Sequence, residues 1–518
     1  MKRPTVRMAA RSQYWGRLGV LRASRCGRVR RSAFLILALL LAAPAVQAQG
    51  FRGTATSTVR YLELRPIVRD TVSFERVTQT PDGVLLFEGR PVTCAQLPLP
   101  CVFYRPGQVE SATALTQDVG VTAWGLGVPG LSATALVRLR QDLGGEFAWP
   151  GSDDDFDALL AYAQYNRGMV RARLGRQQNL SGLGVYAYDG ANVLVEPLAR
   201  LSIEGYAGRS LGRGLLEPSN TALRGVADFP IDTVDRATYL FGAAVRYQPI
   251  TGTALTGRYQ RELLGFDGAL NSERASFDVS TDAVGPVRIE AALDWDVAFN
   301  RIGKTHLRVE APLTRRIVLD ATARRYRPFF ELFTIWGFFS PVAYTEAELR
   351  GTWLPQPGLR VWATGAWRQY DEHNAPVVLG GLTRETTRGA IGSDWLVLPQ
   401  LGVQATYRFE RGFGAFLSSG EATVRYAPDE RWAVFVDASA AQQIEEFRVG
   451  DARVYGVGLG GELSLFPGMD LTGGANLYRQ DFDNRASAAD WNQRRAWVAL
   501  RLGFGEDPGA TRRPGRAW

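Results

Sequence analysis

The sequence predicts an all-β fold, a single up-and-down antiparallel transmembrane β-barrel of about 22 strands (20–22), with short periplasmic turns and long extracellular loops. Two observations predict this fold. Apolar and polar residues alternate with a period of two through most of residues 49–504, and short and long connections take turns along the chain. A mean hydropathy of −0.12 excludes a bundle of membrane helices, because each helix would need an apolar run of about 20 residues.

Residues 1–48 predict a secretory signal peptide cleaved after Ala48. They hold ten Lys and Arg residues and no Asp or Glu, and they end with the apolar run Ala33–Val46 and the small-residue site Val46-Gln47-Ala48. Removing ten positive charges from the formal net charge of +8 leaves −2 for residues 49–518. The basicity of the whole chain therefore does not indicate a nucleic-acid partner. The alternative for this segment is an uncleaved N-terminal membrane helix.

The alternation predicts each strand in turn. In residues 287–297 the odd positions are Val, Ile, Ala, Leu, Trp and Val, whereas the even positions carry Arg, Glu, Ala and two Asp. Because successive strand residues point to opposite faces, one face of this segment is apolar and the other is charged. Similar segments predict strands at 53–68, 112–127, 131–141, 156–166, 168–178, 187–196, 199–209, 236–248, 252–262, 273–281, 287–299, 304–311, 315–326, 343–354, 358–370, 385–398, 401–411, 414–427, 431–441, 451–466, 469–480 and 492–504.

The connections between these segments fall into two alternating classes. One class is short and rich in Pro and Gly, as at 128–130, 285–286 and 467–468. The other is mostly longer and more polar, at roughly 70–111, 143–155, 179–186, 210–235, 264–272, 327–342, 371–384, 442–450 and 481–491, with short members near Asn300 and Gly412. Tight turns on one side and long loops on the other are typical of an up-and-down barrel.

Three features favour lipid against the apolar face. The predicted strands are about 10–16 residues long, whereas soluble strands usually have about 5–6. Many apolar positions carry small residues, which would leave gaps in a packed core. Aromatic residues gather beside the short turns, as in an interfacial girdle: Trp124, Trp353, Trp395, Trp432 and Phe504. The alternative is a periplasmic or surface all-β protein in which a second protein layer covers the apolar face.

The cysteines agree with export. Cys26 lies in the predicted signal peptide, so Cys94 and Cys101 remain in the 70–111 loop. An even pair in an exported chain predicts a disulfide that closes a small loop. A metal site would need more ligands, and no His lies between the two cysteines. No metal and no cofactor are therefore expected.

The polar face would line the interior of the barrel. Arginines and carboxylates on adjacent strands can form cross-strand pairs, and a surplus of Arg would favour anions modestly. The alternative is that most of these charges only solvate the wall. The residues expected to line the pore are Arg171, Arg173, Arg200, Arg288, Arg308, Arg350, Arg360, Arg408, Glu204, Glu290, Glu310 and Glu348.

Several loops are candidates to constrict the pore, since about 22 strands enclose more space than side chains fill. The loops 70–111, 210–235 and 327–342 are long enough to fold inward. The loop 327–342 holds four Phe residues between 329 and 338, a fifth at 339 and one Trp, which is unusually apolar for an exposed loop. Inward packing, or contact with a partner or lipid, would account for it.

No constellation of residues indicates an enzyme. His306 is expected to face the lumen between Lys304 and Arg308 as a wall residue, and His373 to lie exposed in a loop. The run Asp153–Asp155 offers oxygen ligands to a calcium ion, but a solvated acidic loop tip is the favoured interpretation. Phosphate-binding, dinucleotide-binding and metal-ligand patterns do not occur in the sequence.

Two segments resemble bacterial outer-membrane porins. Ala496–Phe504 is similar to the terminal strand of bacterial outer-membrane proteins, which the assembly machinery recognises by apolar residues ending in an aromatic one. Here a tail follows at 505–518, rich in Arg, Pro and Gly and expected to be disordered. Ala172-Arg173-Leu174-Gly175-Arg176-Gln177 and Tyr188-Asp189-Gly190-Ala191 resemble porins of the alginate-export and phosphate-selective type.

Together these features predict a channel in the outer membrane of a Gram-negative-type bacterium. It would pass small polar solutes by diffusion, with a modest preference for anions. Its partners would be outer-membrane lipid and lipopolysaccharide, the assembly machinery and those solutes, with no nucleic acid. The alternative is a non-conducting barrel for surface display or for export and assembly of envelope polymers.

Overall fold

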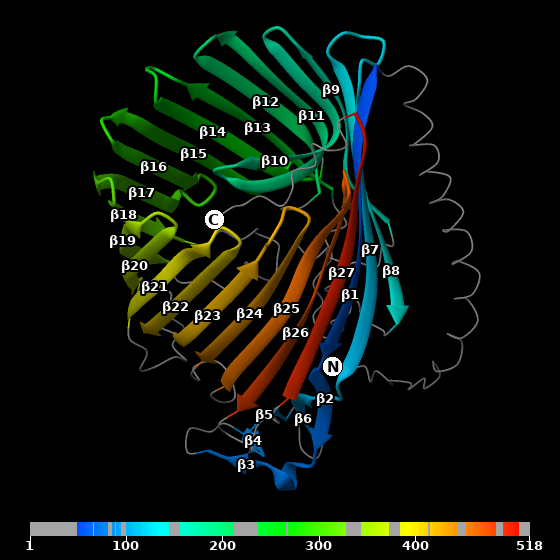
Figure 1. The fold of residues 1–518 in the computed structure, drawn as a ribbon, viewed down its shortest axis with the longest axis vertical. Helices are drawn as coiled ribbons and strands as arrows, with labels where there is room; N and C mark the ends of the chain where they lie inside the picture. Colours follow the sequence, from blue (N-terminus) through cyan, green and yellow to red (C-terminus); the bar gives the residue numbers. More distant parts are fainter. Residues whose placement is uncertain are drawn as a thin grey trace, which may run out of the picture.

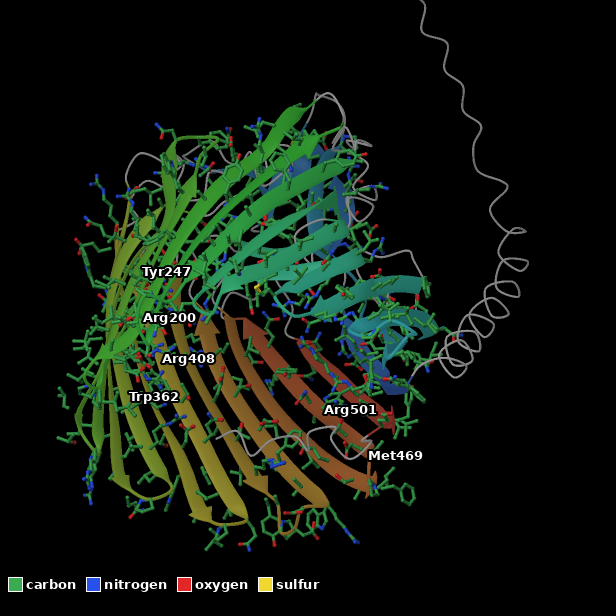
Figure 2. The ribbon with its side chains drawn as sticks, turned by 90° about the horizontal axis from the view of Figure 1, so that it is seen from above. Arg200, Tyr247, Trp362, Arg408, Met469 and Arg501 are labelled. Carbon is green, nitrogen blue, oxygen red and sulfur yellow. A yellow bond between two sulfur atoms is a disulfide. The ribbon has the colours of Figure 1, made fainter. Side chains whose placement is uncertain are left out.

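The computed structural model describes residues 49–65, 67–80, 85–88, 90–94, 100–144, 156–211, 237–265, 268–327, 343–371, 384–412, 415–443, 452–482 and 491–506. Within these ranges 22 antiparallel strands form one sheet that closes on itself, because β1 (Gly50–Leu64) pairs with both β27 (Trp491–Gly505) and β7 (Glu110–Trp124). Figure 1 shows the last strand, in red, beside the first, in blue, and Figure 2 shows the ring from above. In the same ranges no helix has the length and apolarity needed to span a membrane.

The other ring strands follow one another in chain order, each paired with the next. They are β8 (Leu131–Gly144), β9 (Phe156–Arg167), β10 (Val170–Ser181), β11 (Gly184–Leu198), β12 (Leu201–Ser210), β13 (Thr238–Tyr247), β14 (Thr253–Leu264), β15 (Ala269–Val284), β16 (Val287–Asp296), β17 (Arg301–Thr314), β18 (Ile317–Tyr326), β19 (Tyr344–Gln356), β20 (Leu359–Tyr370), β21 (Glu385–Leu398), β22 (Leu401–Gly412), β23 (Ala415–Tyr426), β24 (Trp432–Gln443), β25 (Ala452–Phe466) and β26 (Met469–Phe482). Each of the 22 predicted segments overlaps one ring strand, so the predicted barrel and its strand number are confirmed.

Two of the predicted loops are wrong. The predicted loop 179–186 is almost entirely strand, because β10 and β11 continue through it and leave only the turn Gly182-Leu183. The predicted loop 264–272 shrinks to the short connection between β14 and β15. In both places the side chains contact other parts of the chain inside the barrel, so the strand lacks the apolar face that lipid imposes elsewhere.

Other predictions fall outside the described residues. These are the signal peptide, the acidic run 153–155, nearly all of the loops 210–235 and 327–342, His373 and the tail beyond 506.

The register of the ring separates two faces. On β16 and β17, Arg288 lies opposite Glu310 and Glu290 lies opposite Arg308. The intervening positions pair Ile289 with Val309 on the other face. The apolar face points outward, where Leu174, Leu459 and Leu477 are 67%, 62% and 61% exposed. Lipid must cover such a surface, since soluble proteins do not expose apolar patches of this size.

Most of the aromatic residues predicted for the girdle lie on the outward face. Trp353, Trp395 and Trp432 are 53%, 42% and 38% exposed near the short turns, and Phe504 lies over the backbone of Gly53. Trp124 does not join them. It shares the face of Asp118 and Thr122, and Asp118 pairs with Arg138 across the inner face, so the register places Trp124 inward.

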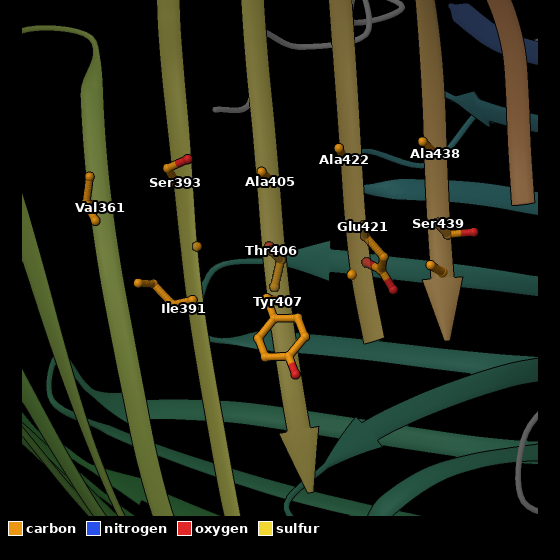
Figure 3. Close-up of a pocket in the computed structure, with 13 residues that line it drawn as sticks. Val361, Ile391, Ser393, Ala405, Thr406, Tyr407, Glu421, Ala422, Ala438 and Ser439 are labelled. Atoms are coloured by element: carbon orange, nitrogen blue, oxygen red, sulfur yellow. The ribbon is translucent and has the colours of Figure 1, made fainter. Parts of the chain in front are cut away.

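The outward face also holds a groove of about 670 Å³ on β20–β24. Its floor is a cross-strand row of small residues, Ser393, Ala405, Ala422 and Ala438, each directly paired with the next. Figure 3 shows these four residues at one level, with Ile391 and Tyr407 beside them. Small outward residues therefore shape the lipid-facing surface and do not fill a core.

The connection between β1 and β7 folds into a small second sheet, here called the loop sheet: β2 (Ile67–Val72), β3 (Thr78–Gln79), β4 (Leu85–Phe87), β5 (Arg90–Thr93) and β6 (Cys101–Pro106). Its core is Val72, Val92, Cys101 and Phe103. The predicted disulfide between Cys94 and Cys101 is present, with the two Cα atoms 4.2 Å apart. Figure 1 shows the loop sheet beyond the end of the barrel, so its strands do not constrict the interior.

One ion pair on the surface of the loop sheet joins its two longest strands. Arg105 donates to Asp70 at 2.5 Å. This bond, together with the backbone N–H of Thr71, holds the pKa of the Asp70 carboxyl below its usual value.

Candidate functional site

The β10–β11 hairpin leaves the wall and enters the interior. Pairing with β9 ends at Arg176 opposite Ala161, and pairing with β12 begins only at Tyr188 opposite Ser210. Among the described residues, the stretch between these positions, which contains the turn at Gly182, has no strand partner outside the hairpin itself. In Figure 1 the hairpin crosses in front of the strands that follow it.

A row of three glycines lies where the hairpin leaves the wall. Gly175 is paired with Gly190, and Gly190 with Gly208, across β10, β11 and β12. A Cβ on Gly190 would lie 2.1 Å from the Ala207 carbonyl oxygen, and one on Gly208 would lie 2.5 Å from that of Asp189. Gly175 has a φ of +126°, which L side chains rarely adopt. Only glycine permits this close crossing of three strands, as expected where a sheet bends sharply.

Arg274 on β15 holds the tip of the hairpin. Its guanidinium donates to the Leu183 carbonyl oxygen at 2.6 Å and to the Tyr186 hydroxyl at 3.0 Å, and it also pairs with Asp294 on β16. Arg274 is only 8% exposed. Since β15 lies four strands beyond β11 in the ring, the hairpin must lie across the inner face of the intervening wall to make these contacts.

Buried residues fill the space beneath the hairpin. Tyr188, Tyr206 and Leu240 form a small core, with the two rings 5.8 Å apart, and Tyr206 donates to Gln260 at 2.9 Å. On β14 the buried Glu262 accepts from Ser272 at 3.1 Å. The part of the wall around Tyr206, Gln260 and Glu262 is therefore packed as a protein interior.

A small polar cavity of about 250 Å³ remains between the hairpin tip and the wall. Its lining includes Gly182, Leu183, Arg274, Asp294, Asp296, Arg301, Lys304 and Tyr326. Arg301 donates to Asp296 at 3.0 Å.

The wall from β17 to β22 carries interlocked charges, centred on Glu346. This carboxylate is 1% exposed and pairs with Arg324, with Arg368 at 2.7 Å and with Arg388 at 3.1 Å. A second carboxylate, Glu410, lies 3.1 Å from Arg388. Three guanidiniums against two carboxylates leave this cluster with a charge of +1.

The pore-lining residues predicted on β16–β22 lie on the inner face, and most of them have contacts. Arg308 donates to Asp320 at 2.7 Å, Arg360 donates to Asp394 at 2.6 Å, and Arg350 lies 4.3 Å from the ring centre of Trp362. The remaining members on this stretch are Arg288, paired with Glu290 at 2.9 Å, Arg408, 3.9 Å from Glu421, Glu310, 3.0 Å from Arg308, and Glu348.

The predicted residues on β10–β12 have more varied positions. Arg173 donates to Gln164 at 2.7 Å, and Glu204 accepts from Asn192 at 2.5 Å. Arg171 is half-buried on β10, opposite Asn166. Arg200 lies in the turn between β11 and β12, where it donates to the Pro249 carbonyl oxygen, and so it is not on the wall. His306 pairs in register with Arg324, on the inner face as predicted.

The part of the wall across the ring from the docked hairpin is rich in glycine. In the 22-strand order, β26 lies eleven places from β15. On the adjacent β25 the inner positions include Gly456, Gly458 and Gly460, and the uncharged side chains of Tyr478, Asn476 and Phe435 lie over them. A Cβ on Gly458 would lie 2.1 Å from the Asn476 amide oxygen. Glycine therefore thins the wall that faces the hairpin.

The sequence predicted neither the inward hairpin nor Arg274 as part of the site, and although it placed Glu346 on the inner face it did not predict the arginine cluster around it. The paired glycines were visible within the two segments that resemble porins, but their cross-strand alignment depends on the register. Arg274 and Glu346 belong to the same alternating pattern as every other inner residue, and only their long-range partners distinguish them.

Comparison with known proteins adds little to what the structure shows about this chain. No family model matches the chain, and no curated protein matches its sequence. The chain is similar in structure to OccAB1 of Acinetobacter baumannii, with 9% identity over 89% of this chain and 98% of that chain and a TM-score of 0.38.

Two further solved structures are a BenF-like porin from Pseudomonas fluorescens Pf-5 (9% identity, 88% of this chain and 99% of that chain, TM-score 0.35) and an anion-selective porin from Comamonas acidovorans (12% identity, 52% and 91%, TM-score 0.31). At these values the likeness carries no argument about function, and the barrel rests on its own strand pairing.

Proposed function

We propose that the chain is an outer-membrane channel through which small polar solutes, preferentially anions, diffuse. The observation that carries the proposal is the closed ring of 22 strands with a charged inner face and an apolar outer face. Strands about 4.8 Å apart and tilted by about 40° give 22 strands a circumference of roughly 140 Å. Inward side chains alone do not fill a ring of this size.

The passage that we propose runs between the docked hairpin and the glycine-lined wall. The hairpin narrows the ring from one side, and Gly456, Gly458 and Gly460 keep the other side thin. The Glu346 cluster on the flanking wall carries one excess positive charge. A solute crossing here meets fixed arginines on one side, which favours anions modestly.

Planar-bilayer recording of the purified mature protein tests this function. Steady ohmic steps are expected, and a salt gradient across the bilayer should give a reversal potential that indicates anion preference. Silence from folded protein would instead support a non-conducting barrel for surface display or envelope polymer export. A cation-selective reversal potential would still agree with a channel but would contradict the proposed preference for anions.

Residues outside the wall have supporting roles in this proposal. Trp353, Trp395, Trp432 and Phe504 would sit at the periplasmic interface of the membrane, as aromatic side chains of barrels do. The signal peptide 1–48 would direct export to the outer membrane. The chemistry in this proposal is diffusion, with no catalytic step and no cofactor.

A further inference from the structure

The polar cavity beside the hairpin tip contains a buried carboxylate oxygen that lacks a donor. The buried side of the cavity carries Asp294 and Asp296 of β16, which are 7% and 2% exposed. Asp296 accepts from Arg301 and from the backbone N–H of Phe299. One oxygen of Asp294 pairs with Arg274, whereas Oδ1 is buried and has no hydrogen-bond partner among the described residues. Because a buried acceptor without a donor is unfavourable, this oxygen favours a ligand that can donate.

The open side of the same cavity carries the only lysine between residues 49 and 518. The whole chain has 60 Lys and Arg residues, and in this range every one of them except Lys304 is arginine. Lys304 is exposed and lies directly opposite Asp294 in the register of β16 and β17. Its ammonium group makes no hydrogen bond or ion pair with another described residue. An arginine suits the planar geometry of a carboxylate, whereas an ammonium group has three donors that rotate to suit a ligand.

The other charges around the cavity are matched within the chain. Each of the three arginines that line it has a carboxylate partner: Arg274 with Asp294, Arg301 with Asp296 at 3.0 Å, and Arg327 with Asp371 at 3.6 Å. One ammonium donor opposite one carboxylate oxygen therefore remains. An anion bound to Lys304 would be repelled by Asp294, and a cation bound to Asp294 would be repelled by Lys304. A hydroxyl group avoids both, because it accepts from the ammonium and donates to the carboxylate.

An aromatic ring lines the cavity next to this pair. Tyr326 of β18 is 38% exposed and lies directly opposite Lys304. The ring centre of Tyr344, the residue opposite Tyr326 on β19, is 5.8 Å away and supports it from the wall. The negative face of an aromatic ring attracts the C–H groups of a solute. The cavity thus combines a contact for C–H groups with a contact for hydroxyls, and a sugar or sugar alcohol carries both.

We propose that this cavity binds a neutral polyhydroxy solute of about the size of a monosaccharide. One hydroxyl bridges Lys304 and Asp294, and the C–H groups lie against Tyr326. At about 250 Å³ the cavity is smaller than the roughly 300–1,000 Å³ of pockets for drug-sized ligands, so the solute is small. A water molecule could bridge the two charges but would leave the ring without a contact.

The docked hairpin is part of this binding site. Gly182 and Leu183 at its tip line the cavity, and Arg274 holds the tip in place. A bound solute therefore stabilises the docked hairpin, because it binds only when the cavity is formed. The inference goes beyond the proposed channel, and the two fail separately, since a barrel that conducts nothing can still hold a solute here.

The single lysine provides the readout of occupancy. The folded mature chain, in a detergent without a sugar headgroup, is treated briefly with an amine-acetylating reagent, and peptide mass spectrometry follows the modification of Lys304. A short lysine peptide in the same solution corrects for effects on the reagent. The probes are methyl α-D-glucoside, methyl α-D-galactoside and D-mannitol, which have no aldehyde that reacts with the amine. At least one probe, at about ten times its dissociation constant, should slow the modification about tenfold, because only the empty cavity reacts.

The test variant is Tyr326→Leu. Loss of the ring should weaken binding about tenfold and reduce the protection of Lys304 from about tenfold to about twofold. The matched control is Tyr478→Leu, which removes an inward ring from β26, 4.8 Å from Arg495, and should keep the protection. Arg274→Met, which releases the hairpin, should lose the protection as well. Heat-modifiable migration on gels checks that each variant is folded, and if Tyr326→Leu is not, Arg274→Met decides.

Three results would overturn the proposal. Unchanged modification of Lys304 with all three probes would mean that water alone occupies the cavity. Protection by acetate or by alanine as strong as that by the best probe would assign the cavity to an anion or to a zwitterion. Protection that persists in both Tyr326→Leu and Arg274→Met would place the bound probe elsewhere.

Discussion

The two sides of the barrel interior differ in how much protein projects into the ring. Part of the wall between β12 and β16 is covered by the inward hairpin, which Arg274 and a buried tyrosine core hold in place. Across the ring, β25 carries glycines at its inner positions, so that neighbouring side chains lie flat against the backbone. The hairpin narrows the interior on one side, and the inner glycines leave it wider on the other. The width of the passage therefore depends on the backbone of both sides, and not only on the charged side chains of the wall.

The largest expected effect comes from releasing the hairpin. Arg274→Met removes the bonds to Leu183 and Tyr186 and leaves Asp294 buried without its partner, a loss of about 3–5 kcal/mol. The hairpin should then leave the wall part of the time, and single-channel recordings should show larger and noisier steps.

Two further variants sharpen this result. Arg138→Met breaks a comparable pair with Asp118 away from the hairpin, and its step size should stay near that of the parent chain. Adding Asp294→Asn to Arg274→Met removes the stranded charge and should recover part of the stability but not the docking. Equal steps from Arg274→Met and Arg138→Met would show that Arg274 does not hold the hairpin.

The next effect concerns the glycine row. Gly190→Ala places a methyl group 2.1 Å from the Ala207 carbonyl oxygen, so the strands must separate, at a cost of about 1–3 kcal/mol. The temperature at which the barrel unfolds in detergent should fall. Gly205→Ala is the matched control, because it lies on β12 with no atom within 4 Å of the new methyl group. A similar shift from both variants would remove the special role of the row.

A smaller effect is expected on selectivity. Replacing Arg324 and Arg388 with Gln takes two positive charges from the Glu346 cluster and reverses its sign. The reversal potential in a salt gradient should move toward cation preference. Arg479→Gln removes a charge of the same kind from the outer face and should leave the potential unchanged. An unshifted potential in the double variant would mean that solutes do not pass this cluster.

The smallest effect is a pH response of the loop sheet. The bonds from Arg105 and Thr71 lower the pKa of Asp70 in the folded state, so their stabilisation is present above the unfolded value of about 3.9 and is lost as the pH falls through the lower folded value. The protection of the β2 and β6 amides against hydrogen exchange, after correction for the intrinsic exchange rate at each pH, should therefore fall at acid pH. Asp70→Asn should exchange faster at neutral pH and lose this response, and an unchanged pH dependence in that variant would assign it to another group.

The sequence predicted the ring because lipid imposes a simple rule on every strand that it touches. All 22 segments follow this rule, including those on β16 and β17 where the alternation is clearest. The rule fails between residues 179 and 186, because that part of the hairpin contacts protein on the inside of the barrel and has no lipid-facing side. It also misplaces Trp124, whose face depends on the register of the last residue of β7.

The site was less predictable because alternation shows only which residues face lipid, and not which inner residues contact one another. Residues such as Arg308 and Arg360 could be assigned to the inner face from alternation alone. The contact between Arg274 and Leu183 joins residues 91 positions apart, and the Glu346 cluster gathers arginines from three other strands. No local pattern encodes such partners, since they depend on how far a strand pair bends and on the register between strands.

The account depends most on solvent inside the ring and lipid outside it, and two neighbouring residues of β22 test this directly. Thr406→Cys places a thiol on the inner face and Ala405→Cys places one on the outer face, in a mature chain whose two native cysteines form a disulfide. In single-channel recordings a charged, water-soluble thiol reagent should reduce the current through Thr406→Cys and leave Ala405→Cys unchanged. A response from Ala405→Cys and not from Thr406→Cys, or the same response from both, would contradict the account.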